Sequence, residues 1–266
     1  MRSNSSWAPT ERFEWIDAVK GFAILGILLN HLVEEFAPGA WFTNPSDNWP
    51  AFAERMHSFF PPDENPVFSL VKIAGWLGDS FPGVFLLLSG MGLTLSAMKK
   101  HDTGFSPVSF YKKRLLRIFP LYILIHFIIV LLSVGVPQAH VAFTDYRVLL
   151  SFLGLRFTDQ LFFFINPSWW FIWTLFQLYL IFPFLLLFLN RSGVRLFLFV
   201  SFLITFIIRL LAITGIYGGD SLYYWMTGLF AGTRLAEFSS GMVLAFLLVN
   251  SERFIHFGRI DNRLLF

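Results

Sequence analysis

The sequence predicts an all-α fold, a polytopic bundle of transmembrane helices, and three observations lead to this prediction. Of the 266 residues, 56% are hydrophobic, 35 are Phe and only 14% are charged, which is too apolar for most soluble proteins. Apolar runs of about 20 residues, enough to cross a bilayer, recur along the chain. The basic residues lie mainly between these runs, so the net charge of +3 indicates membrane orientation and not a nucleic-acid partner.

The first predicted helix, residues 17–36, is apolar on most faces and charged on one. At about 100° per residue, five side chains fall within about 60° of one direction. These residues form the polar stripe: Asp17, Lys20, His31, Glu34 and Glu35. Lys20 and His31 are eleven residues, about 16 Å, apart, so the stripe runs along roughly half of the hydrocarbon core. Because each charge near the centre of a span costs about 2.5–3.5 kcal/mol, we expect the stripe to face protein or water and to have a function.

Six spans with a cytoplasmic amino terminus fit the rest of the chain. Residues 37–71 carry four acidic residues, one Arg and repeated Pro and Asn, which predicts an external loop. Six Lys and Arg between 99 and 117 predict a cytoplasmic connector. Three charged residues interrupt 147–165, for which we predict a non-spanning role; if this segment crosses, the count becomes seven. After the first helix, the expected spans are 81–98, 118–136, 171–189, 196–215 and 224–249.

His31 is the candidate general base, because imidazole has the side-chain pKa nearest to neutral pH. Glu34 or Glu35, one turn further on, could orient the ring or stabilise its protonated form. The alternative is a His near a helix end beside two solvated carboxylates. The face that His31 shares with Asp17 and Lys20 favours the functional interpretation.

Two features of other spans are predicted to be structural. His126 stands alone in an apolar span and is predicted to be a hydrogen-bonded core residue. Ser89, Gly90 and Gly92, in the run FLLLSGMGLTLS, would allow a neighbouring helix to approach closely.

Arg114 and Arg117, in FYKKRLLRIFP, are three residues apart on one helical face at the start of a span. Basic residues at such a position commonly determine membrane orientation. Guanidinium groups also bind phosphates through two hydrogen bonds, so the pair could hold a cytoplasmic donor that carries several phosphates. The residues alone leave both interpretations open.

Polar residues in the later spans are candidates for binding an acceptor. Arg234 and Glu237, in TRLAEFSSG, are three residues apart and form either a structural ion pair or part of a site, and Arg209 could face the same interior. The run PSWWFIWTLFQLYLIFP supplies further candidates, although the default interpretation of its Trp169, Trp170 and Trp173 is an outer aromatic belt. The acceptor-binding candidates are Trp170, Gln177, Tyr179, Arg209 and Glu237.

Several chemistries have no support in the sequence. The chain has no Cys, so it offers no disulfide, thiolate nucleophile or Cys-based metal site. It contains no phosphate-binding glycine loop, zinc-binding helix signature or GxSxG motif. We therefore predict no metal, and we disfavour nucleotide hydrolysis, metalloprotease and serine hydrolase activities.

Together, these stretches resemble the membrane-bound acyltransferase 3 family. The resemblance rests on the opening RFEWIDAVKGFAILGILLNH, on FPGVFLLLSGMGLT, on the Arg114 and Arg117 pair before IFPLY, on WWFIWTLFQLYLIFP and on RLAEFSSGMVLA. The first stretch has the family's Asp, a basic residue and a His, although Lys20 stands where Arg is common. The family's bundles have about ten spans, so the resemblance implies that residues 1–266 are a single integral membrane acyltransferase domain without its C-terminal helices.

The resemblance implies an O-acyltransferase, acting from acetyl-CoA or another acyl-CoA on a hydroxyl of a cell-envelope glycan or similar acceptor, in a bacterial inner membrane. His31 would then be the base, Asp17 and Lys20 would position substrates, and Arg114 with Arg117 would hold the CoA phosphates. A transporter or flippase of a polar or lipid-linked substrate, with the same stripe lining its path, is the alternative from a different class. An inactive relative that acts as a membrane partner is a third possibility, against which the intact Lys20 and His31 argue.

Overall fold

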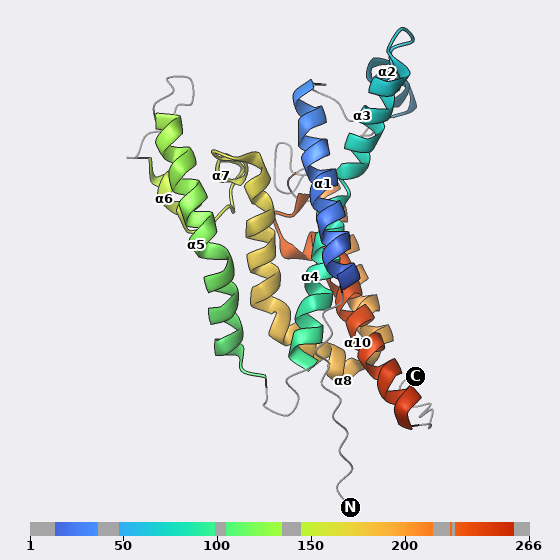
Figure 1. The fold of residues 1–266 in the computed structure, drawn as a ribbon, viewed down its shortest axis with the longest axis vertical. Coiled ribbons are helices and arrows are strands. Elements are labelled where there is room, and N and C mark those ends of the chain that lie inside the picture. The colour runs from blue at the N-terminus through green and yellow to red at the C-terminus, as the bar shows by residue number, and fades with distance from the viewer. Residues whose placement is uncertain are drawn as a thin grey trace, which may run out of the picture. The chain divides into compact units, whose positions relative to one another are not determined.

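The computed structural model describes residues 14–36, 48–98, 105–134, 145–214, 224 and 227–257. Every regular element in these ranges is a helix, as the sequence predicts (Figure 1). In chain order they are α1 (Glu14–Phe36), α2 (Trp49–Phe59), α3 (Pro66–Gly78), α4 (Phe81–Met98), α5 (Pro107–Val134), α6 (Tyr146–Phe152), α7 (Asp159–Phe162), η2 (Pro167–Trp169), α8 (Trp170–Ile213), η3 (Ala231–Arg234) and α10 (Leu235–Phe257).

Five of the described helical stretches are long and apolar enough to cross a membrane, so the chain is an integral membrane protein. They are Trp15–Glu34, Pro66–Met98, Pro107–Ser133, Trp170–Ile213 and Ala231–Asn250. The segment 145–169 contributes none, because α6, α7 and η2 have 7, 4 and 3 residues. The predicted non-spanning role of this segment is therefore confirmed.

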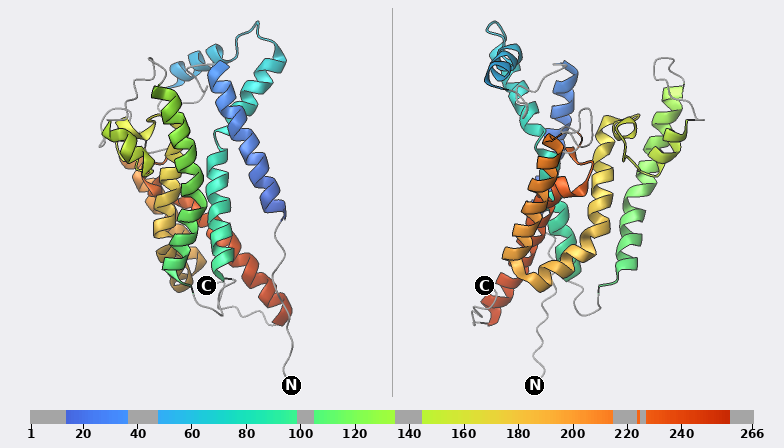
Figure 2. Two further views of the ribbon diagram at one scale, coloured as in Figure 1. Left: turned by 60° about the vertical axis from the view of Figure 1, so that its left-hand side comes forward. Right: turned by 180° about the vertical axis from the view of Figure 1, so that it is seen from behind.

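Helix α8 accounts for two of the six predicted spans. Its 44 residues would extend over about 66 Å if straight, twice the thickness of a hydrocarbon core. Gly193 interrupts it with φ 75° and ψ 170°, a left-handed conformation that glycine tolerates and other residues avoid. The chain turns back at this residue, and the two halves run as a hairpin (Figure 2).

The chain divides into two compact units, Met1–Leu88 and Ser89–Phe266. In the first unit, α1 packs on α3. The Nδ2 atom of Asn30 donates to the carbonyl oxygen of Gly75 at 3.1 Å. A Cβ atom at Gly78 would lie 2.2 Å from the carbonyl oxygen of Gly26, so only glycine allows the two backbones to approach this closely.

Part of the predicted external loop 37–71 is helical. Asn48 and Asn65, each followed within two residues by a Pro, begin helices, whereas Pro61 and Pro62 lie in the turn between them. Asn48 caps α2 by accepting a hydrogen bond from the Ala51 amide at 3.1 Å. Asn65 caps α3 by accepting from the Val67 amide at 2.9 Å, and Pro66 occupies the first helical position. Both are ordinary amino-terminal signals, which the analysis of composition alone passed over.

In the second unit, α10 packs along α8. A Cβ atom at Gly90 would lie 2.1 Å from the carbonyl oxygen of Phe238 on α10, which confirms the predicted close helix approach. Gly92, one residue beyond Met91, has no atom within 4 Å of the corresponding position, so close packing explains only one of the two glycines.

Candidate functional site

His31 lies near the carboxyl end of α1 and pairs with Glu34. The Nδ1 atom of His31 is 2.9 Å from Oε2 of Glu34, one turn further along the helix. The two side chains are 42% and 45% exposed, so neither is sealed in a core. Because an ionised carboxylate only accepts hydrogen bonds, we assign the proton to Nδ1 and the basic lone pair to Nε2. Such a pair can act as an oriented general base.

Contacts between α1 and α3 determine where His31 lies. Asn30 precedes it on α1 and is anchored to Gly75 of α3. Asp79, which ends α3, carries a charge that acts on the imidazole of His31. This second carboxylate has no local signal in the sequence, because it lies 48 residues further along the chain, at the end of another helix.

Two residues of the stripe, Asp17 and Lys20, lie nearer the amino end of α1 than His31 does. Asp17 and Lys20 are half-buried on the same side of the helix as His31. Lys20 is three turns away, about 16 Å, so its side chain cannot touch the imidazole. The side chain of Glu35 lies outside the described part of the chain. The structure thus brings together His31 and Glu34, and leaves the other described stripe residues at a distance from them.

Arg114 lies on α5 beside Tyr179 of α8. Its guanidinium carbon is 5.7 Å from the ring centre of Phe110, and its buried Nε atom has no hydrogen-bond partner among the described residues. Charge interactions link Arg114 to Tyr179, whose hydroxyl also bonds Ser89. Arg117, one turn on, is exposed. The structure therefore joins a candidate donor-binding residue with a candidate acceptor-binding residue.

The last span begins later than predicted. It was expected from residue 224, but the α-helix α10 begins at Leu235 and the one-turn η3 precedes it. Side chains of α8 hold the non-helical backbone before η3: Thr174 Oγ1 donates to the Gly228 carbonyl at 2.7 Å, and Trp173 Nε1 donates to the Leu229 carbonyl at 3.0 Å. These side chains thus give the carbonyl groups of the non-helical segment their hydrogen-bond partners.

Gln177 holds the same segment through both ends of its amide. Nε2 donates to the carbonyl oxygen of Leu229 at 3.0 Å, and Oε1 accepts from the Ala231 amide at 3.0 Å. A weaker bond at 3.4 Å joins Nε2 to Trp173 within α8. This geometry favours a structural role for Gln177 over the predicted contact with an acceptor.

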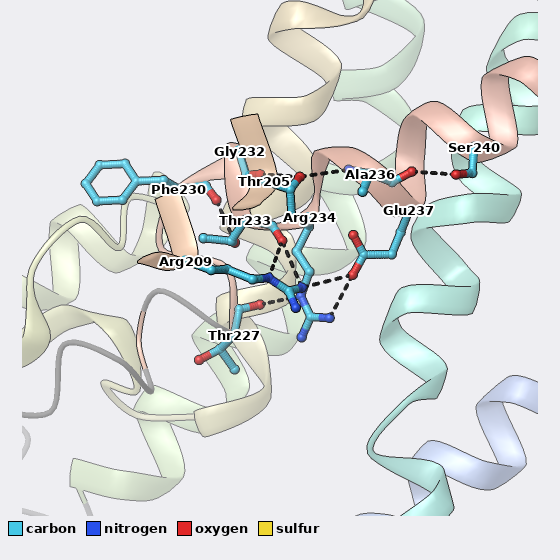
Figure 3. Close-up of polar contacts among 10 residues, drawn as sticks. All are labelled: Thr205, Arg209, Thr227, Phe230, Gly232, Thr233, Arg234, Ala236, Glu237 and Ser240. Carbon is cyan, nitrogen blue, oxygen red and sulfur yellow. Dashed lines mark hydrogen bonds and ion pairs between the residues drawn. The ribbon is translucent and has the colours of Figure 1, made fainter. Parts of the chain in front are cut away.

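Two arginines share one carboxylate beside this segment (Figure 3). Oε1 of Glu237 lies 3.1 Å from Nη1 of Arg234 and 3.4 Å from Nη2 of Arg209. The Arg209 guanidinium also donates to the Thr233 carbonyl at 3.0 Å and 3.2 Å, and Nε of Arg234 donates to the Thr227 carbonyl at 3.1 Å. We call Arg209, Arg234 and Glu237 the arginine cluster. The predicted ion pair is confirmed, and Arg209 joins it from a different helix.

The arginine cluster adjoins an aromatic group that includes Trp170. The guanidinium of Arg234 lies 5.9 Å from the Trp170 ring, which itself packs near Phe162 and Tyr224. Of the five predicted acceptor-binding residues, Arg209 and Glu237 therefore belong to the cluster and Trp170 lies beside it.

The chain matches the acyltransferase domain of the acyltransferase 3 family over residues 13–260. It belongs to the acyltransferase 3 family. The match extends from α1 to the end of α10 and includes the His31–Glu34 pair, Arg114 and the arginine cluster. No curated protein and no solved structure was found to match the chain. The family identifies a membrane acyltransferase domain, so these polar groups are candidates for binding an acyl donor and an acceptor.

Arg156 of the acyltransferase holds the loop between residues 151 and 164, although in the sequence it stands out only as a charge that interrupts an apolar segment. It is fully buried. Its Nη1 atom donates to the carbonyl oxygens of Leu161, Phe164 and Phe162 at 2.9, 3.0 and 3.2 Å, and Nη2 donates to Ser151 Oγ at 2.7 Å. Burial lowers the pKa of Arg156. The guanidinium thereby joins the carbonyl groups of three residues in a loop that contains only short helices.

His126 is buried, as predicted, but the predicted hydrogen bond is wrong. Neither ring nitrogen has a partner among the described residues. The ring instead stacks on Trp169 at 4.5 Å between centroids and lies 4.1 Å from Phe152. Trp169 is only 8% exposed, so it packs inside the second unit and does not form part of a surface belt.

Lys72 is a buried charged residue that was not among the candidate functional residues predicted from the sequence. It lies on α3 with 5% of its side chain exposed, and its ammonium donates to Glu64 Oε1 at 2.6 Å and to the Phe59 carbonyl. Aromatic rings of Phe59 and Phe68 lie 4.8 Å and 5.6 Å from the ammonium. The hydrogen bond from Lys72 is the main cause of a lowered pKa for the Glu64 carboxyl. A lysine eight residues after a glutamate, amid Phe residues, is the signal that could have found the pair.

Among the described residues, no three His, Asp or Glu side chains come together in a way that could hold a metal ion.

Proposed function

We propose that the chain is an integral membrane O-acyltransferase that moves an acyl group, most simply acetyl, from acyl-CoA to a hydroxyl of a cell-envelope glycan or a similar acceptor. Membership of the acyltransferase 3 family supports the reaction type. The observation that carries the assignment is the 2.9 Å contact between His31 and Glu34, because it gives the imidazole a defined orientation and tautomer.

In the proposed mechanism, Nε2 of His31 removes the proton of the acceptor hydroxyl as its oxygen attacks the thioester carbonyl carbon. A carbon–oxygen bond forms and the carbon–sulfur bond breaks. The imidazolium then returns the proton to the leaving CoA thiolate, so the enzyme ends in its starting state. The Glu34 carboxylate stabilises the imidazolium that exists between the two transfers.

Arg114 and Arg117 are the proposed partners of the CoA phosphates. Their guanidinium groups suit phosphate oxygens, and the unpartnered buried Nε of Arg114 is a donor without an acceptor. If the protein lies in a bacterial inner membrane with its amino terminus on the cytoplasmic side, this end of α5 faces the cytoplasm, which contains acyl-CoA. Asp17 and Lys20 are assigned to positioning the substrates, and Tyr179 to the acceptor.

Labelled acetyl transfer tests the proposal. Inverted membrane vesicles carrying the protein, its His31→Ala variant or a His57→Ala control would receive labelled acetyl-CoA, and alkali-labile label would be measured. His57 is a suitable control because it is an exposed His on α2 of the same unit. We expect incorporation with the parent protein and the control, and loss with His31→Ala. Normal incorporation by a well-inserted His31→Ala variant would refute the assigned base.

Transport of a polar or lipid-linked substrate is the second candidate, favoured by the non-helical segment before η3. Interrupted helices at the depth of a span line the binding sites of many transporters. A transporter would not consume acyl-CoA, and substitution of Arg114 and Arg117 would then alter orientation alone. Protein-dependent movement of a substrate without any release of CoA would favour this alternative.

A further inference from the structure

The arginine cluster carries one more positive than negative charge. Arg209 and Arg234 share a single carboxylate, that of Glu237. Among the described residues, Glu237 and Arg234 are the charges that act on Arg209. Both arginines lie within candidate spans, where an unbalanced charge is costly. A bound anion would remove this imbalance.

The hydrogen bonds of the cluster leave both donors and an acceptor for a ligand. Arg209 uses Nε and Nη2, and Arg234 uses Nε and Nη1, so one terminal nitrogen of each guanidinium has no partner in the described part of the chain. Oε2 of Glu237 is buried and also lacks a partner there. Two guanidinium donors beside one carboxylate acceptor match an anionic group that lies next to a hydroxyl.

The cluster is accessible, and hydrogen bonds to the backbone hold it in place before a ligand binds. The side chains of Arg209, Arg234 and Glu237 are 36%, 18% and 25% exposed, so a ligand can reach them. The Thr233 carbonyl orients Arg209, and Thr205 accepts a bond from the Ala236 amide at 3.1 Å at the start of α10. Binding therefore requires little reorganisation of the backbone, which favours affinity.

We propose that the arginine cluster binds a carboxylate or phosphate adjacent to a hydroxyl, and that the acceptor is an acidic sugar or polyol phosphate and not a neutral sugar. The naming of an acceptor rests on the proposed acyltransferase function, but the anion site itself does not. Binding can therefore be measured without any transfer reaction.

Calorimetric titration of the purified protein in lipid nanodiscs tests the site, with D-glucuronate and D-glucose as a matched pair of probes. We expect glucuronate to bind at least about tenfold more tightly than glucose, because charge-assisted hydrogen bonds have this magnitude. Arg209→Gln should remove this preference and Arg209→Lys should retain part of it. The control is Arg191→Gln, which removes an exposed arginine elsewhere and should change nothing. Equal binding of the two probes would overturn the proposal.

Inorganic phosphate separates binding from a purely structural role. Arg209→Gln lowers the cluster charge from +1 to zero, whereas Glu237→Gln raises it to +2. We therefore expect phosphate to bind several-fold more weakly to the first variant and several-fold more tightly to the second. If both variants bind phosphate more weakly, in step with lower melting temperatures, the cluster is structural and the proposal fails.

Adenosine 3′,5′-bisphosphate distinguishes the acceptor from the donor as the source of the anion. If the proposal is correct, its affinity should fall in Arg114→Gln and stay unchanged in Arg209→Gln. Dependence on Arg209 would assign the cluster to CoA and overturn the acceptor assignment. Absence of His31-dependent transfer, by contrast, would refute the proposed function while leaving these binding results intact.

Discussion

The His31–Glu34 pair and Arg156 both place charge in an apolar sequence, but their surroundings differ. His31 is 42% exposed and its partner comes from the next turn of the same helix. Arg156 is fully buried and donates to four oxygen atoms between residues 151 and 164. A buried charged group that donates to several oxygen atoms of one loop stabilises a fold. The partly exposed imidazole of His31, oriented by Glu34, remains accessible for chemistry.

Replacement of Arg156 should have the largest effect on stability. Arg156→Met removes the hydrogen bonds that a charged guanidinium donates to three carbonyl oxygens and a hydroxyl, and each such bond contributes about 1.5–3 kcal/mol. We expect a loss of at least about 4 kcal/mol, seen as poor insertion or a strongly lowered melting temperature in detergent. Arg156→Lys should not restore the protein, because an ammonium cannot reach four acceptors spread over the loop.

Arg147→Met is the matched control on the same segment. Arg147 binds Asp145 through Nη2 at 2.6 Å, but its side chain is 33% exposed. Exposed pairs contribute at most about 1 kcal/mol, so the variant should melt close to the parent. Equal destabilisation by the two variants would remove the distinction between the fully buried Arg156 and the partly exposed Arg147.

Glu34 tests the opposite side of the comparison, where activity should change and stability should not. Glu34→Gln replaces the charged partner of His31 by a neutral amide, and one charge-assisted hydrogen bond contributes about 1.5–3 kcal/mol. We expect acetyl transfer to fall by about 10- to 150-fold through kcat, with the melting temperature unchanged. Glu34→Asp should recover part of the rate if the role is to position His31. A lowered melting temperature with normal transfer would make the pair structural.

Gly90 extends the contrast from charges to packing. Gly90→Ala places a methyl group against the Phe238 carbonyl, and backbone cannot yield as a side chain can. We expect a loss of about 1–3 kcal/mol of stability. Gly92→Ala, on the same helix with open space around it, should be neutral or slightly stabilising. Similar melting temperatures for the two variants would show that α4 does not need this close contact.

The sequence predicts features that depend on local periodicity. The apolar runs predict α4 with its observed bounds, and the spacing along α1 predicts that His31 and Glu34 share a face. Gly193 lies in the short basic connector that the sequence predicts between two spans. These outcomes follow from helix geometry and require no knowledge of neighbouring segments.

Features that depend on distant partners were not predicted. Arg156 looks like an interruption until the carbonyl groups of its loop are seen to converge on it. Arg209 was expected to face the same interior as Glu237, but their contact across 28 residues was not predicted, and the non-helical start of the last span depends on Thr174 of α8. The apolar composition of such a segment predicts a helix. The side chains that stabilise its non-helical backbone belong to another element, so the local sequence does not reveal them.

Lys72 and Glu64 give the smallest expected effect, and it depends on pH. Hydrogen bonds from Lys72 and then Ser69 lower the pKa of the Glu64 carboxyl. Its contribution to stability is therefore present above the ordinary pKa of glutamate and is lost as the pH falls through the lowered value. Glu64→Gln should melt a few degrees below the parent at pH 7, and this gap should close below about pH 4. Thermal denaturation in detergent at several pH values measures it.

Glu54→Gln provides the control, since Glu54 is an exposed carboxylate on α2 of the same unit. That variant should follow the parent at every pH. A constant gap for Glu64→Gln from pH 7 down to pH 3 would mean that the amide disturbs packing and that the Glu64 charge contributes nothing. Lys72 would then resemble Arg156, a buried cation satisfied by carbonyl oxygen and aromatic rings, instead of a member of an ion pair.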